Sequence, residues 1–189
     1  LLEAIVRGGT SERRFGLECV SIEEVRRAAA VMNGIVSQQQ GVKTAHSRIQ
    51  FTPNFCPVEE YEEAFRLGAR VIVDNIEILR LRPDIFHGKN VGLRVDPNAH
   101  AHQSDTKFGH HAHVRTSGGK QKFGMPIAEA LAAVQEAQEE LGVNVTGIHV
   151  HVGSGVMVPS VWRDTLEKIC DLVLENASDL YSVSVIFCF

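Results

Sequence analysis

The sequence predicts an α/β protein in which strands and helices alternate along one arc of a (β/α)8 barrel. Apolar spacing switches repeatedly between the two-residue period of a strand and the 3.6-residue period of a helix, with Gly, Pro or polar residues at the switches. Such alternation implies right-handed βαβ units and parallel strands. A closed barrel of this kind needs about 250 residues, so six strands within 189 residues make a partial barrel. A doubly wound sheet is the alternative, although no GxGxxG follows the first strand.

Each predicted strand is a short apolar run bounded by turn-forming residues. The strands cover Phe15–Val20, Arg48–Thr52, Arg70–Val73, Asn90–Val95, Val145–Val152 and Tyr181–Phe187. Apolar residues three and four positions apart predict the helices. These cover Leu1–Val6, Ser21 to about Met32, Val58–Leu67, Asn75–Leu81, Ile127–Leu141 and Val161–Leu174.

Start and stop signals support these boundaries. Two glycines end the first helix, and Ser21 with Glu24 three residues later forms the capping signature of the second. Pro126 suits the first turn of the helix that follows it. Two stretches interrupt the alternation: Asn33–Ala45 is interpreted as a loose insertion and Asp96–Met125 as a long loop.

Composition narrows the function classes. The chain is 44% hydrophobic and 22% charged, with a net charge of -4, and it has no basic stripe, so neither nucleic acid nor a membrane surface is an expected partner. The closing apolar run Val183–Phe189 is too short to cross a bilayer. Four cysteines without a CxxC pair favour a reducing, cytoplasmic location. Because residue 1 is Leu1 within a helical pattern, we expect the chain to begin inside a longer protein.

The most informative motif is GIHVHVGSG, over Gly147–Gly155. Side chains alternate along a strand, so His149 and His151 share one face. Gly153 and Ser154 follow directly, and a turn of this composition brings backbone N–H groups and a hydroxyl close to an anion. An imidazole above a phosphate cradle suits a phosphorylated aromatic cofactor. The alternative is that the histidines pack a core and the glycines turn the chain.

Polar residues also lie at or directly after the carboxyl-terminal parts of the other predicted strands. Because functional groups of parallel barrels gather at the carboxyl ends of the strands, these residues are expected to converge on one mouth. They are Glu18, Ser21, Thr52, Asn54, Asp74, Asn75, Arg94 and Asp96. For Ser21, Asp74 and Asn75, capping of the following helix is the alternative role.

The segment Ala99–Gly124 holds five of the nine histidines. Imidazole is a common zinc ligand, yet the spacing matches no HExxH or HxxxH arrangement, and no cysteine or second carboxylate run completes a ligand set. We therefore expect no metal site.

Six segments, in order, resemble the pyridoxal-phosphate-dependent decarboxylases of the alanine-racemase-like barrel class. They are LECVSIEEV (Leu17–Val25), FTPNF (Phe51–Phe55), VIVDNIEIL (Val71–Leu79), VGLRVDPN (Val91–Asn98), HVRTSGGKQKFG (His113–Gly124) and GIHVHVGSG. The chain is most similar to the diaminopimelate decarboxylases of lysine biosynthesis. The run HHAHVRTSGGKQKFG resembles the forms that are fused to an aspartate kinase.

The resemblance implies roles for five residues. His151 would lie against one face of the pyridine ring of pyridoxal 5'-phosphate, and Arg94 beneath it, as the catalytic pair. Gly153 and Ser154 would hold the phosphate, and Glu18 would be the acidic residue close to the cofactor. In this family the ring accepts the electrons released when carbon dioxide leaves an amino acid.

The resemblance also implies parts that this sequence does not show. No lysine stands in the family's Tyr-Ala-x-Lys-Ala-Asn context, and no Gly-Gly-Gly loop follows the last strand. We therefore expect residues 1–189 to be the central part of one barrel domain, without the first strand that carries the cofactor lysine and without the C-terminal β-domain. The full-length protein would be a homodimer. An ornithine- or arginine-type decarboxylase, or a non-catalytic relative that serves as a binding protein, are the alternatives.

Overall fold

The fold is a parallel sheet whose strands follow one another in chain order. The computed structural model describes Leu2, Ala4 and residues 16–36, 48–97, 123–152, 157, 159–175 and 184–188, without the side chains of residues 35, 36, 175 and 184–188. The strands are β1 (Leu17–Cys19), β2 (Ile49–Phe51), β3 (Arg70–Val73), β4 (Asn90–Asp96), β5 (Met125–Pro126), β6 (Asn144–His151) and β7 (Ser184–Cys188). The helices are α2 (Ile22–Val36), α3 (Val58–Arg66), α4 (Glu77–Leu81), α5 (Pro83–Phe86), α6 (Ile127–Glu139) and α7 (Pro159–Glu175).

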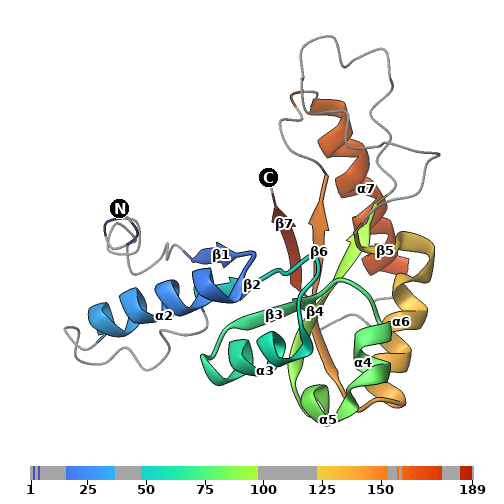
Figure 1. Cartoon of the computed structure of the whole chain (residues 1–189). Coiled ribbons are helices and arrows are strands. Elements are labelled where there is room, and N and C mark those ends of the chain that lie inside the picture. The colour runs from blue at the N-terminus through green and yellow to red at the C-terminus, as the bar shows by residue number, and fades with distance from the viewer. Residues whose placement is uncertain are drawn as a thin grey trace.

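Strand order separates the two predicted architectures. The sheet runs β1-β2-β3-β4-β6-β7 with every pair parallel, and the two-residue β5 pairs with the end of β4. This order never reverses, whereas a doubly wound sheet has a switch point where it does. The helices in Figure 1 accordingly run around the outside of the strands. The chain therefore forms the predicted partial barrel.

The outer face of the sheet packs against the helices. Phe51 of β2 contacts Tyr61 of α3 edge to face, and Tyr61 contacts Phe86 of α5 in the same way. Phe51 and Phe86 are completely buried, as is Leu93 of β4 on the same side of the sheet. Since side chains alternate along a strand, the residues at the alternate positions of each strand point to the opposite, concave face.

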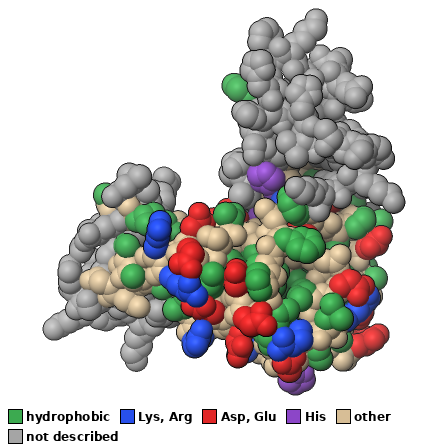
Figure 2. Space-filling view, in the orientation of Figure 1, with side chains coloured by type: hydrophobic (Ala, Val, Ile, Leu, Met, Phe, Trp, Pro, Cys, Tyr) green, Lys and Arg blue, Asp and Glu red, His purple; other side chains and the backbone are tan. Residues whose placement is uncertain are grey.

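Ion pairs tie neighbouring helices together on the outside. Arg26 of α2 donates two hydrogen bonds of 2.7 Å to Glu63 of α3, and Arg80 of α4 donates bonds of 2.5 and 2.6 Å to Glu136 of α6. Both arginines also pair with a glutamate three residues earlier on their own helix. Figure 2 shows the mixture of acidic and basic side chains that results on this side of the molecule.

Several predicted boundaries need correction. Helix α2 continues to Val36 instead of ending near Met32, so the start of the predicted insertion is helical; each residue added to an existing helix gains a hydrogen bond. The two end residues of the predicted loop lie in strands instead: Asp96 is the last residue of β4, and Met125 is the first residue of β5. Helix α4 starts at Glu77 with Ile76 as its N-cap residue, and the Glu77 N–H donates to the Asn75 side chain at 2.9 Å.

Two short elements were not expected, and one prediction falls mostly outside the structure. Helix α5 begins with Pro83 in its first turn, and β5 consists of two residues. Both are too short for periodicity to indicate them. Of the predicted helix Leu1–Val6, only Leu2 and Ala4 are described, and both are helical. In the part of the chain that the structure describes, no helix is long and apolar enough to span a bilayer.

Candidate functional site

Polar side chains gather on the concave face at the carboxyl ends of the strands. The register pairs Glu18 of β1 with Gln50 of β2, and Arg94 of β4 with His149 of β6. Partners in adjacent parallel strands point to the same face of the sheet. The predicted convergence is therefore observed for six side chains that contact one another in two groups: Glu18, Thr52 and His149 in the first, and Asn54, Asp74 and Arg94 in the second.

Glu18 is the centre of the first group. Its Oε1 accepts a hydrogen bond from Thr52 Oγ1 at 2.9 Å and a longer one from Gln50 Nε2 at 3.4 Å. The same oxygen lies 3.3 Å from His149 Nε2. Thr52 is 4% exposed and His149 is 1% exposed, so this carboxylate is held by groups that are themselves buried.

The His149 ring is buried and makes no hydrogen bond to any described residue. Its approach to Glu18 lacks the alignment of a hydrogen bond, and neither ring nitrogen has another partner within the described residues. Buried polar atoms are usually satisfied. An imidazole placed in this way is suited to a group that enters the concave face from outside the chain.

Arg94 is the centre of the second group. Its side chain is 10% exposed, its Nη1 donates to Asn54 Oδ1, and the same nitrogen lies 3.5 Å from Asp74 Oδ1. The acceptors come from segments that follow two adjacent strands, β2 and β3. A guanidinium stays charged at any physiological pH, so the site has a permanent buried cation.

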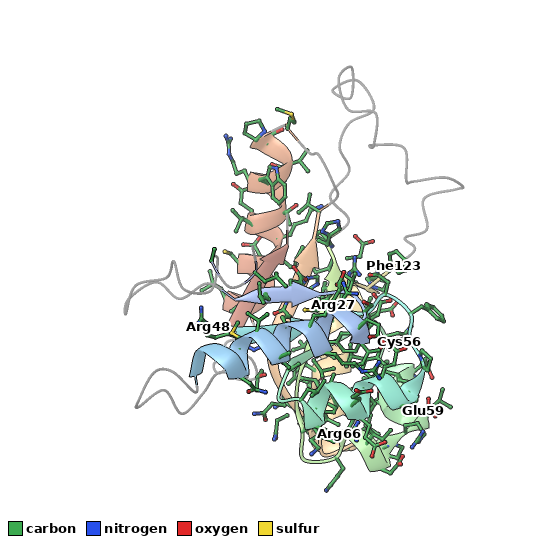
Figure 3. All side chains as sticks on the ribbon, turned by 60° about the vertical axis from the view of Figure 1, so that its left-hand side comes forward. Arg27, Arg48, Cys56, Glu59, Arg66 and Phe123 are labelled. Atoms are coloured by element: carbon green, nitrogen blue, oxygen red, sulfur yellow. The ribbon has the colours of Figure 1, made fainter. Side chains whose placement is uncertain are left out.

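A turn from a distant part of the sequence covers this cation. The Phe123 ring lies over the Arg94 guanidinium, with 5.2 Å from Cζ to the ring centroid. The N–H of Gly124 donates to Asp74 Oδ1 at 3.1 Å. Figure 3 shows Phe123 at the end of the sheet where the chain passes Cys56 and enters α3.

Burial and these contacts shift the pKa of the Asp74 carboxyl group in opposite directions. Removal from water raises the pKa of its carboxyl group, while the Gly124 N–H and then the Arg94 and His149 charges lower it; the net result is a raised pKa. The carboxylate therefore retains part of its desolvation penalty despite the neighbouring cation.

The other predicted residues divide into three cases. His151 ends β6 and is partly exposed at the mouth, and Asp96 is buried at the end of β4. Ser21 and Asn75 accept hydrogen bonds at the starts of helices: Ser21 Oγ accepts the Glu24 N–H at 3.4 Å, and Asn75 Oδ1 accepts the Glu77 N–H at 2.9 Å, although the N-cap residue of α4 is Ile76. The phosphate-cradle residues Gly153 and Ser154, together with the histidine-rich residues 100–113, lie outside the described residues.

Sequence reasoning missed one part of the site. Phe123 and Gly124 were not among the predicted site residues, and Asp74 had capping as its alternative role, yet the three meet around Arg94. The signal in the sequence was the KFG run directly before a predicted helix. Among the described residues, no group of three or more His, Cys, Asp or Glu side chains is arranged to hold a metal ion.

Comparison with known proteins gives one consistent result. Residues 4–186 match the family model described as "Pyridoxal-dependent decarboxylase, pyridoxal binding domain". The chain is 33% identical over 126 residues to diaminopimelate decarboxylase of Methanothermobacter thermautotrophicus, covering 66% of this chain and 28% of the relative. It is 31% identical over 157 residues to the enzyme of that name from Deinococcus radiodurans, covering 83% and 36%.

Solved structures confirm the fold class. A crystal structure of Helicobacter pylori diaminopimelate decarboxylase, a point mutant in complex with L-lysine, superposes with a TM-score of 0.72 at 21% identity and covers 98% of this chain and 42% of that one. The chain therefore spans about a third of the length of these curated relatives.

Proposed function

Since the chain belongs to the pyridoxal-dependent decarboxylase family, through its pyridoxal-binding domain, we propose that it is the central part of the cofactor-binding barrel of a meso-diaminopimelate decarboxylase. The observation that carries the proposal is the polar mouth, where the Glu18–His149 pair and Arg94, which the register places beside His149, share the concave face of a family-type barrel. The relatives that share at least 30% identity over most of this chain are named diaminopimelate decarboxylases.

The residues on the concave face fit pyridoxal 5'-phosphate. The cofactor is an anionic, planar aromatic group, and the mouth offers a buried guanidinium, a buried imidazole whose nitrogens have no hydrogen-bond partner among the described residues, and a second imidazole at the rim. In the proposal, His151 and Arg94 would hold the ring, Glu18 would lie close to it, and Gly153 and Ser154 would hold the phosphate. When bound, the cofactor accepts the electrons released by loss of carbon dioxide.

This chain's own residues supply orientation and electrostatics. Arg94 has acceptors from two adjacent segments, so its charge is fixed before a ligand arrives, and fixed charges stabilise a reacting group more effectively than mobile ones. Glu18 is fixed in the same way by Thr52. We propose that the substrate, a small amino acid, binds above this mouth. We also propose that the whole protein is a cytoplasmic homodimer.

Turnover by the full-length protein tests the substrate. Flanking coding sequence would be recovered, the whole protein expressed, and carbon dioxide release measured with meso-diaminopimelate, ornithine and arginine. We expect the highest kcat/KM with meso-diaminopimelate. Faster turnover of ornithine or arginine would identify that amino acid as the substrate in place of meso-diaminopimelate. Binding of cofactor without turnover of any of the three would favour a non-catalytic binding protein.

The polypeptide of 189 residues provides the matching control. None of its lysines stands in the family's cofactor-lysine motif, so incubation with pyridoxal phosphate and borohydride should label no lysine specifically. Stoichiometric labelling of one lysine, together with carbon dioxide release, would contradict this assignment.

A further inference from the structure

We propose that Asp74 is a positioning residue for Arg94, and that it acts by fastening the Phe123–Gly124 turn over the guanidinium. The inference rests on the proposed function, because it concerns the same mouth. It adds the covering turn to the site. That turn follows residues 98–122 and is therefore far from Asp74 in the sequence.

A single oxygen joins the two halves of the arrangement. Asp74 Oδ1 accepts the Gly124 N–H at 3.1 Å and lies 3.5 Å from Arg94 Nη1. The carboxylate thus fixes the guanidinium and the covering turn to each other. Asn54 accepts from the same Arg94 nitrogen on another side, so the end of a long side chain is restrained by two oxygens and one ring.

The turn itself is shaped for close contact. Gly124 has φ +83°, in the left-handed region that favours glycine. A Cβ at this position would lie 3.3 Å from Arg94 Cγ and 3.3 Å from the backbone nitrogen of Asp96. The next residues, Met125 and Pro126, pair with Val95 and Asp96 of β4. The turn is therefore fixed to the strand that carries Arg94.

The pH dependence of stability bears on the role of Asp74. Desolvation is the largest influence on Asp74 and raises the pKa of its carboxyl group. An acid with a raised folded-state pKa stabilises the fold most at pH values below its unfolded pKa, and this contribution is lost as pH rises through the folded pKa. Above the folded-state pKa the ionised carboxylate therefore contributes less stability than the protonated acid, which Asp74→Asn resembles.

The decisive variants are Asp74→Asn, Asp74→Ala and Phe123→Leu in the full-length protein. Asp74→Asn keeps an acceptor for the Gly124 N–H but removes the charge, Asp74→Ala removes both, and Phe123→Leu keeps apolar contact without an aromatic face. Asp84→Asn is the matched control, because Asp84 also pairs with an arginine, Arg82, but lies in α5, away from the mouth.

Three measurements are combined: thermal midpoint, amide hydrogen exchange of the peptide containing residues 123–126, and binding of pyridoxal phosphate followed by its absorbance. We expect Asp74→Asn to melt at or above the wild-type temperature. Asp74→Ala should exchange faster at residues 123–126. All three mouth variants should bind cofactor about ten- to a hundredfold more weakly, or lose kcat by that factor, as expected for misplacement of a site group.

The outcomes keep the two proposals distinct. Wild-type protein that binds no pyridoxal phosphate would refute the proposed function, while faster exchange in Asp74→Ala, and not in Asp84→Asn, would still support the fastening of the turn. Wild-type protein that binds cofactor, with Asp74→Asn and Asp74→Ala binding and turning over equally well, would overturn the inference. So would a lower melting temperature in Asp74→Asn with cofactor binding unchanged.

Discussion

Gly92 lies one layer below Arg94 on the concave face, and its replacement by alanine tests how tightly the barrel interior is packed. A Cβ at Gly92 would lie 2.5 Å from Ile72 Cδ1 and 3.3 Å from the carbonyl oxygen of Gly147. Ile72 is 1% exposed, so its terminal methyl group cannot turn into solvent. Overpacking of this kind costs about 1–3 kcal/mol.

The identity of the obstructing atom defines a double-mutant cycle. Ile72→Val removes Cδ1 alone and costs about 0.5–1.5 kcal/mol as a single change. In the double variant the new methyl group fills the space that Cδ1 leaves. The two substitutions should therefore couple favourably, by about 1–2 kcal/mol, within the usual range for residues in contact.

Urea unfolding followed by circular dichroism measures all four free energies. Gly34→Ala is the control, because a Cβ at Gly34 in α2 meets nothing within 4 Å, and the change should raise stability by up to about 1 kcal/mol. Additive effects of Gly92→Ala and Ile72→Val, or a Gly92→Ala variant as stable as wild type, would refute the reasoning.

Two further predictions concern the outer layer and the thiols. Hydrogen bonds from Arg26 lower the pKa of Glu63 from its ordinary 4.5; this stabilisation is present above 4.5 and is lost as pH falls through the folded-state pKa. Glu63→Gln should lower the thermal midpoint at pH 7 and low salt, and it should narrow the difference in thermal midpoint between pH 7 and pH 3. An unchanged midpoint at pH 7 would count against the ion pair. Burial raises the pKa of Cys19 and Cys56 to about 11, so iodoacetamide at pH 7.5 should modify the exposed Cys170 before either of these two, and mass spectrometry of the digested protein would show the order.

Long elements were predictable because their patterns repeat. Strand β3, Arg70–Val73, has the predicted bounds, and α3 ends one residue before the predicted end at Leu67. Short elements left no such pattern. The pairing of β5 with the end of β4 depends on a contact across residues 98–122, which no local window contains.

The site was predictable to the extent that strand ends determine position. Glu18, Arg94 and His149 lie near the carboxyl ends of strands and Thr52 directly follows one, and a parallel sheet brings those ends together. The role of Asp74 was not predictable in the same way. An aspartate before a helix is an ordinary cap in sequence, and only the folded chain places the Gly124 N–H, fifty residues later, on its Oδ1.

The pairing of β5 with β4 has a consequence for variation among related sequences. It places the residues on either side of 98–122 in adjacent strands, so the separation of the two ends of that segment is set by the sheet and is independent of the segment's length. Insertions and deletions between Pro97 and Phe123 should thus be tolerated by the barrel, because the strands on either side keep Arg94 and its partners in place.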